Sequence, residues 1–340
     1  MIVTVTGEIP KEKLGFTLPH EHILIDLRPV VEESAEEHFH EKLKADTRRL
    51  VCSDPYFLQD NAFYLGEEKA LFELLLYKEA GGVSVADATL GEIGRSPAAL
   101  RRLSARSGVQ ILMGSGHYIA PAHNAFAKSA SEEALAEELF RELTVGVNGV
   151  RAGFIGEIGT SAQITEDEWK CTRAAFRAQR ETGAAIHFHT ALWEENGVPI
   201  LAEAKKYGVP AECICIDHVD VVLRQDYCER LMDAGAYIEF DNCGKEFFMP
   251  RRDTGLIRGR FAYDYERAQL IAALVERGYK DRILLSNDIC LKSMLATYGG
   301  NGFAHVARTM LPMLRDCGVS EEAIRAITVE NPANFFDIAQ

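Results

Sequence analysis

Two pairs of histidines in this chain have the spacing that would place both imidazoles of a pair on one face of a β-strand. His20 and His22 lie in LPHEHILID, and His187 and His189 lie in HFHTA. Residues i and i+2 of a strand point to the same side, so each pair can turn both rings toward one interior. An H-x-H pair alone is weak evidence, because strands produce it by chance.

Three further ionisable residues lie near the ends of other short apolar runs. Glu157 lies in AGFIGEIGT, His218 in CICIDHVD and Asp288 in RILLSND. A lone carboxylate is very unfavourable in a protein interior unless it is paired or bound to a metal. A single histidine at a strand end is more often structural than a ligand. Six such groups at strand ends are a poor match to chance, and together they suit Zn, Mn, Fe or Co rather than a thiolate site.

The elements that must position these residues are eight β-rich runs that alternate with helical segments. The runs lie at 16–26, 83–89, 109–117, 152–160, 184–191, 213–220, 236–242 and 282–288. Helical spacing is found at 68–81, 131–145, 164–183, 197–207, 222–234, 264–278, 303–316 and near 320–328. Crossover helices return the chain in one direction, so the strands should pair in parallel.

This alternation predicts an α/β fold, a single-domain (β/α)₈ TIM barrel that spans residues 1–340. An open doubly wound sheet is the alternative, but no G-x-G-x-x-G follows the first run and the strand count is eight. Chemistry in such barrels takes place at the carboxyl ends of the strands. In the fourth run, strict alternation would turn Phe154 and Ile158 toward the helices and Glu157 toward the interior.

A long segment at about 29–66 separates the first two runs and reads as loop and short helix. Connections of that length in a compact domain are usually lids or partner surfaces. We therefore expect this insertion to lie near the active site or at a subunit contact.

Charge and composition narrow the class of protein. The net charge of −14 and the pI of about 5.3 argue against nucleic acid and anionic membrane as partners. Eight cysteines without a C-x-x-C pair indicate reduced thiols. The N-terminus lacks the features of a signal peptide, and no apolar run is long enough for a membrane span. We expect a cytoplasmic enzyme that acts on a small molecule; a homodimer is one option that the sequence leaves open.

The order and spacing of LPHEHILID, RAGFIGEIGTS, HFHTA, CIDHVD and ILLSND resemble the phosphotriesterase-like family of the amidohydrolase superfamily, in particular the phosphotriesterase homology proteins. The resemblance covers nearly the whole chain. It implies two divalent metal ions per chain, with zinc as the first choice and Mn, Co or Fe as alternatives. The implied metal ligands are His20, His22 and Asp288 at a buried ion, His189 and His218 at a more exposed ion, and Glu157 between the two.

The bridging position is where this sequence departs from many family members, which place a carboxylated lysine there. RAGFIGEIG contains no lysine. A residue count against the lysine form fits Gly156 as well as Glu157, but glycine cannot ligate a metal. His187 is not a ligand in the family pattern, so we expect it to support a ligand or to pack in the core.

The resemblance implies a hydrolase in which a metal-bridging hydroxide attacks an electrophilic carbonyl carbon or phosphorus. Asp288 would then be catalytic and accept the proton of the nucleophile. The expected substrate is a lactone or carboxylic ester, for which a phosphorylated sugar lactone is one candidate. The rivals are a phosphotriesterase or organophosphate hydrolase, an amide or phosphodiester hydrolase, and a metal-bearing barrel that binds a ligand without turnover.

The loop after the seventh run, 243–259, is basic within an acidic chain, which favours an anionic substrate. Lys245 and Arg251 are the candidate anion-binding residues, since such side chains suit phosphate or carboxylate. A solvated loop with ordinary surface charge is an equally good interpretation. Tyr118, just past the third run, could donate a hydrogen bond in the pocket or simply pack there.

Overall fold

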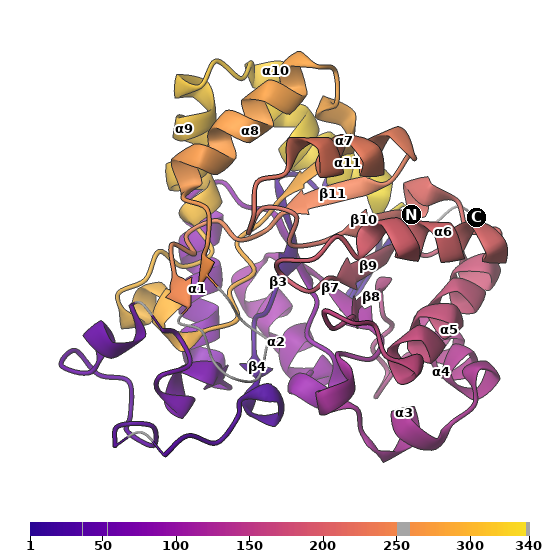
Figure 1. Cartoon of the computed structure of the whole chain (residues 1–340), viewed down its shortest axis with the longest axis horizontal. Helices are drawn as coiled ribbons and strands as arrows, with labels where there is room; N and C mark the ends of the chain where they lie inside the picture. Colours follow the sequence, from indigo (N-terminus) through magenta and orange to yellow (C-terminus); the bar gives the residue numbers. More distant parts are fainter. Residues whose placement is uncertain (36, 53, 250–258, 338–340) are drawn as a thin grey trace.

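Eight parallel strands occupy the eight predicted runs in the computed structural model, which describes residues 1–35, 37–52, 54–249 and 259–337. Neighbours in the sheet are also neighbours along the chain, and the strands form a nearly closed barrel at the centre of the molecule (Figure 1). The predicted (β/α)₈ TIM barrel is confirmed. In sequence order the strands are β3 (Thr17–Glu21), β6 (Ser84–Asp87), β7 (Gln110–Ser115), β8 (Phe154–Gly159), β9 (Ile186–His189), β10 (Ile214–Ile216), β11 (Tyr237–Phe240) and β14 (Ile283–Leu285).

Helices surround the strands at the predicted positions (Figure 1). Six of them are single α-helices: α1 (Glu67–Glu79), α4 (Glu132–Thr144), α5 (Glu166–Thr182), α6 (Gly197–Tyr207), α7 (Gln225–Asp233) and α8 (Asp264–Glu276). The segment predicted at 303–316 contains the π-helix η11 (Val306–Met310) and α9 (Leu311–Asp316). The terminal helix continues beyond its predicted end through α10 (Glu321–Arg325), η12 (Ala326–Glu330) and α11 (Asn331–Phe335).

The sequence analysis did not identify the helix between the second and third strands, α2 (Pro97–Ser107). Its boundary signals are present in the sequence: Pro97 stands in the first turn, and Gly108 ends the helix with a φ of 73°. The short α3 (Ala125–Ser129) was also not identified.

The side chain of Glu21 closes the seam between the first and last strands. It accepts hydrogen bonds from Ser286 Oγ (2.9 Å), from Asn287 N and Nδ2 (both 2.8 Å) and from Ile289 N (2.9 Å). The single hydroxyl proton of Ser286 is shared with the carbonyl oxygen of His20, which lies 2.6 Å from Ser286 Oγ. Glu21 points away from the two histidines beside it and fixes the loop that carries Asp288.

The amino end of the barrel is closed by an N-terminal hairpin and the C-terminal aromatic residues. The hairpin consists of β1 (Ile2–Thr4) and β2 (Gly7–Ile9), whose three-residue strands are too short to stand out as a sequence pattern. Phe335 and Phe336 pack beneath the barrel, with ring centroids 5.0 and 5.6 Å from that of His187. A buried apolar layer therefore lies under the polar residues of the barrel interior.

Strand β8 departs from strict alternation, which corrects one expectation. Its pairing with β9 shifts between Ile155 and Ile158. Phe154, predicted to face the helices, instead lies inside the barrel, where its ring is 5.4 Å from that of His187. The irregularity centres on Gly156, whose φ is 125° and where a Cβ would lie 2.6 Å from the His187 carbonyl oxygen. With Phe154 inside the barrel, strict alternation would turn Glu157 outward. The irregularity at Gly156 reverses the alternation, so Glu157 faces the interior.

The described part of segment 29–66 is loop with short helical turns, as predicted. The helical turns are η2 (Arg28–Val30), η3 (Arg48–Val51) and η4 (Gln59–Ala62), and β5 (Phe63–Tyr64) pairs with β4 (Ile25–Asp26). Across the described ranges, every helix is either too short or too polar to cross a bilayer.

Replacement of Glu21 by glutamine should destabilise the metal-free barrel by about 2–4 kcal/mol, because an amide cannot accept four hydrogen bonds as a carboxylate does. Urea unfolding of the metal-free protein measures this without a contribution from ion loss. Glu12→Gln, on an exposed turn, is the matched control and should change stability by less than about 0.5 kcal/mol. Equal midpoints for the two variants would contradict the role assigned to Glu21.

Candidate metal centre

Glu157 lies at the centre of the predicted ligands, at the carboxyl end of the barrel. Its Oε2 is 3.0 Å from His189 Nδ1 and 3.5 Å from His20 Nε2, and its Oε1 is 3.3 Å from His22 Nε2. The carboxylate is 1% exposed. A single side chain thus faces imidazoles from β3 and β9, which is what a bridging ligand requires.

The remaining two predicted ligands complete the cluster from opposite sides. Asp288 Oδ1 lies 3.1 Å from His22 Nε2 and 3.8 Å from His20 Nε2. His218 Nε2 lies 2.8 Å from His189 Nδ1 and 3.9 Å from Glu157 Oε2. Two overlapping groups each have donor atoms within 4.8 Å of one another. The first is His20, His22 and Asp288, and the second is His20, Glu157 and His218.

The outer nitrogens of two candidate ligands are held by neighbours, and their inner nitrogens face the other candidate ligands. His22 Nδ1 is 2.9 Å from Thr89 Oγ1, and His218 Nδ1 is 2.9 Å from Asp241 Oδ1. Such support is usual for metal-binding histidines, because it fixes the tautomer and the ring orientation. Among the described residues, His20 Nε2 has no hydrogen-bond partner although it is fully buried. The donor set therefore fits divalent ions.

Two of the candidate ligands have a strained backbone. His218 has a φ of 63° and Asp288 a φ of 45°, in the left-handed region that non-glycine residues rarely adopt. Strain of this kind typically costs about 1–3 kcal/mol and persists where the surroundings impose it. Here, Asp241 holds the backbone N–H of His218 at 3.1 Å, and Glu21 holds the residues on either side of Asp288.

Without an ion, the carboxylates of the centre draw protons onto its imidazoles. Burial lowers the pKa of His22, but hydrogen bonds to Asp288 and Glu157 outweigh burial and raise it to about 9. Burial likewise lowers the pKa of His218, and the charge of Asp241 raises it to about 9. Burial works to raise the pKa of Glu157, yet the neighbouring His20 and His189 hold it well below its usual range. A cation and these protons compete for the same negative charge.

Two of the three predicted substrate-binding residues lie in the cavity above this centre. Tyr118 is 8% exposed, and its ring centroid is 4.9 Å from that of His189. Lys245 is buried, not displayed at the mouth, and its ammonium group donates a hydrogen bond to Asp288 Oδ2. Arg251 lies outside the described residues.

The cavity contains about 1290 Å³ of empty space, including its solvent-open mouth. Val31 and Tyr56, from the 29–66 segment, form part of its wall. Most of the remaining wall is apolar: Leu27, Val30, Pro55, Ile119, Leu192, Phe247, Phe261 and Leu291.

Several interior residues that support the centre were not identified from the sequence. Asp241 orients His218 and is itself held by Asn242 Nδ2 at 2.7 Å. Asp217 and Glu239 face the lower side of His20. A signal existed for two of them, because Glu239 and Asp241 have the same i, i+2 spacing as the histidine pairs.

Comparison with known proteins places this geometry among hydrolases. The model of the Phosphotriesterase family matches residues 1–336. The N-acetyltaurine hydrolase of Danio rerio is 30% identical over 339 residues, which cover 97% of this chain and 96% of that protein. A resiniferatoxin-binding protein from Rhodobacter sphaeroides has a TM-score of 0.94 and 35% identity, covering 99% of this chain and 94% of that one. A mutant of a phosphotriesterase-like lactonase from Deinococcus radiodurans has a TM-score of 0.77 and 27% identity, with coverage of 99% and 100%.

Metal affinity should weaken as the pH falls, since the raised pKa values of His22 and His218 mean that both are protonated in the metal-free protein below about pH 9. Each displaced proton lowers the apparent affinity about tenfold per pH unit. Competition with a chromophoric chelator at pH 6.5, 7.5 and 8.5 should show a loss of about 10- to 100-fold per unit. An affinity that does not change over this range would contradict the assignment of these two imidazoles as ligands.

Proposed function

Because this chain belongs to the Phosphotriesterase family, and is accordingly a metal-dependent hydrolase, we propose that it uses two divalent ions to hydrolyse a carboxylic ester or lactone. The observation that carries the proposal is the position of Glu157, whose two oxygens face three imidazoles within 3.5 Å. A carboxylate so placed can join two ions in one centre. His20, His22 and Asp288 would hold one ion, and His189 and His218 the other.

The ions would supply a water of lowered pKa and a Lewis acid for the substrate carbonyl. Zinc is the ion we propose, since two or three imidazoles with carboxylates are a donor set that it commonly takes; Mn, Co and Fe are alternatives. The eight cysteines of the chain are all unpaired. This supports a reducing compartment, and we propose the cytoplasm.

Asp288 is the residue we propose to move the proton of the attacking water. Its Oδ1 faces His22, while its Oδ2 accepts a hydrogen bond from Lys245. Burial works to raise the pKa of Asp288, but the Lys245 ammonium and His22 keep it well below its usual range. The carboxylate is therefore ionised and oriented before the substrate arrives, and one of its oxygens faces the reaction centre.

The walls of the cavity support a substrate with a sizeable apolar group. Tyr56, Tyr118, Phe247 and Phe261 line the space above the centre. Among the described residues that line the cavity, Lys245 is the one lysine or arginine. It is buried beside the carboxylate of Asp288. An ester or lactone whose apolar part occupies the walls and whose carbonyl reaches the floor fits this distribution. A phosphorylated sugar lactone would depend on Lys245 leaving Asp288 for the phosphate.

Hydrolysis of an N-acyl amide is the second candidate, because relatives such as the Danio rerio protein are named N-acetyltaurine hydrolases. An amide carbonyl requires the same centre, and a sulfonate or carboxylate on the substrate would give Lys245 an anion to bind. The two candidates differ in the leaving group and can be separated directly by substrate.

The decisive experiment follows proton release by the metal-loaded protein on a panel of substrates. The panel contains aryl esters, alkyl lactones, a phosphorylated sugar lactone, N-acetyltaurine and a chromogenic phosphotriester. We expect fastest turnover on an apolar ester or lactone, abolished by a chelator and restored by Zn or Mn. No hydrolysis of any ester or lactone would overturn the proposed substrate class. Binding of panel compounds without hydrolysis of any of them would indicate a metal-bearing binding protein instead of an enzyme.

Lys245→Met separates the two roles of this lysine. If Lys245 binds an anionic group of the substrate, KM for charged substrates should rise about 10- to 100-fold while neutral esters are little affected, since a hydrogen bond to a charged group is worth about 1.5–3 kcal/mol. Lys292→Met is the matched control, because Lys292 is also buried but pairs with Asp60 at 2.8 Å. An equal fall in kcat on charged and neutral substrates would show instead that Lys245 acts through Asp288.

A further inference from the structure

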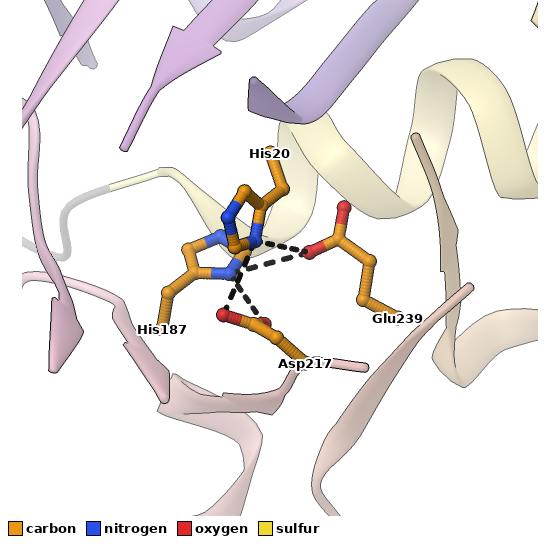
Figure 2. A group of neighbouring side chains, drawn as sticks. All are labelled: His20, His187, Asp217 and Glu239. Carbon is orange, nitrogen blue, oxygen red and sulfur yellow. Dashed lines mark hydrogen bonds and ion pairs between the residues drawn. The ribbon is translucent and has the colours of Figure 1, made fainter. Parts of the chain in front are cut away.

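A second group of metal-ligand side chains lies below the candidate centre, in the barrel interior. His20, His187, Asp217 and Glu239 project from β3, β9, the end of β10 and β11, and point toward one another (Figure 2). All four side chains are fully buried. One donor atom from each residue lies within 4.8 Å of the donor atoms of the other three.

Imidazole nitrogens and carboxylate oxygens of this group lie 2.9–3.9 Å apart. His20 Nδ1 is 3.3 Å from Asp217 Oδ2 and 3.9 Å from Glu239 Oε2. His187 Nδ1 is 2.9 Å from Asp217 Oδ1 and 3.3 Å from Glu239 Oε2. A tetrahedral zinc ion with ligand distances of about 2.0–2.2 Å holds its donors about 3.3–3.6 Å apart. Two of the four pairs, at 3.3 Å, already have this spacing, and one ion would require a single Asp217 oxygen to face both histidines.

The hydrogen bonding of the group is incomplete without a further partner. Within the described ranges, His20 Nδ1, Asp217 Oδ2 and Glu239 Oε1 are buried atoms that lack any hydrogen-bond partner. Glu239 Oε2 is 3.9 Å from the Cys215 thiol, which is a weak donor. A buried polar atom without a hydrogen bond destabilises the fold, so three such atoms in one cluster indicate a missing partner.

The two carboxylates of the group depend on its own imidazoles for positive charge. Two carboxylates are present, and in the described part of the chain their ion-pair partners are only His20 and His187. The nearby basic side chains are committed elsewhere, Lys245 to Asp288 and Arg267 to Asp220. Phe335 and Phe336 close the cluster from below, so solvent does not offset the charge.

We propose that His20, His187, Asp217 and Glu239 form a separate structural site for a divalent transition ion of the zinc type. Two imidazoles and two carboxylates are a donor set that a dication takes, and an ion there would give His20 Nδ1 and Asp217 Oδ2 a partner and join four strands. The two nitrogens of His20 face opposite ways, Nδ1 toward this site and Nε2 toward Glu157. With ions on both sides, His20 would be an imidazolate whose ring proton passes to solvent.

The rivals are a proton or a water molecule in place of the ion. Burial raises the pKa of Glu239 to about 8, so a protonated Glu239 could donate a hydrogen bond within the cluster at neutral pH. An ordered water with three polar partners could also fill it. Neither rival scatters anomalously.

Anomalous diffraction from crystals of the zinc-loaded full chain, collected above and below the zinc edge, tests the proposal. We expect a peak within about 2.0–2.3 Å of His187 Nδ1, Asp217 and Glu239, distinct from any peak beside Glu157. The proposed hydrolytic centre is judged from that other peak, so failure of one site does not decide the other. The absence of a peak in the buried cluster, with a water or direct hydrogen bonds in its place, would overturn the inference.

Ion counting in solution gives an independent measurement. Elemental analysis of the zinc-loaded protein after desalting should give one ion fewer per chain for Glu239→Gln and for His187→Gln than for the unaltered protein. Cys215→Ser, at the same depth but not a ligand, is the matched control and should retain the full count. Equal counts in all four proteins would overturn the proposal, and the anomalous map of the unaltered protein decides the matter if a variant does not fold.

Discussion

Burial of negative charge inside the barrel is the constraint on which the remaining features depend. Glu157, Asp217, Glu239, Asp241 and Asp288 are each at most 5% exposed and lie within one interior. Taking carboxylates out of water without compensation is prohibitive, so the fold must provide positive charge for them. Imidazoles surround the carboxylates and one lysine reaches them, but protonated histidines are only one way to supply the charge. Divalent ions supply more of it in the same volume.

That constraint explains why the parts around the centre are held so firmly. Candidate ligands on different strands must converge to within a few tenths of an ångström, and three of them are anchored by a neighbour. Thr89 holds His22, Asp241 holds His218, and Glu21 holds the loop that carries Asp288. The apolar layer beneath the barrel excludes water, which strengthens every charge interaction above it. The substrate cavity begins where this rigid polar interior ends.

The sequence predicted the barrel because its eight apolar runs are regular, and it predicted the position of Glu157 correctly. The argument from strict alternation that turned Glu157 inward was incomplete. It misplaced Phe154 and could not predict the shift in pairing at Gly156. Helix α2 (Pro97–Ser107) was missed although its boundary residues are typical. The cluster of His20, His187, Asp217 and Glu239 was missed although Glu239 and Asp241 have the i, i+2 spacing of the histidine pairs. Its members lie on four strands that are distant in sequence, and only the folded barrel brings them together.

The most direct test of the claim that this interior is built around cations is the thermal unfolding midpoint with and without divalent ions. An ion that binds only the folded state stabilises it by about 4 kcal/mol at a thousandfold excess over Kd. The account predicts that protein stripped by a chelator unfolds several degrees lower, and that zinc restores the midpoint in a concentration-dependent manner. Identical midpoints for stripped and zinc-treated protein, with no ion retained after desalting, would contradict it.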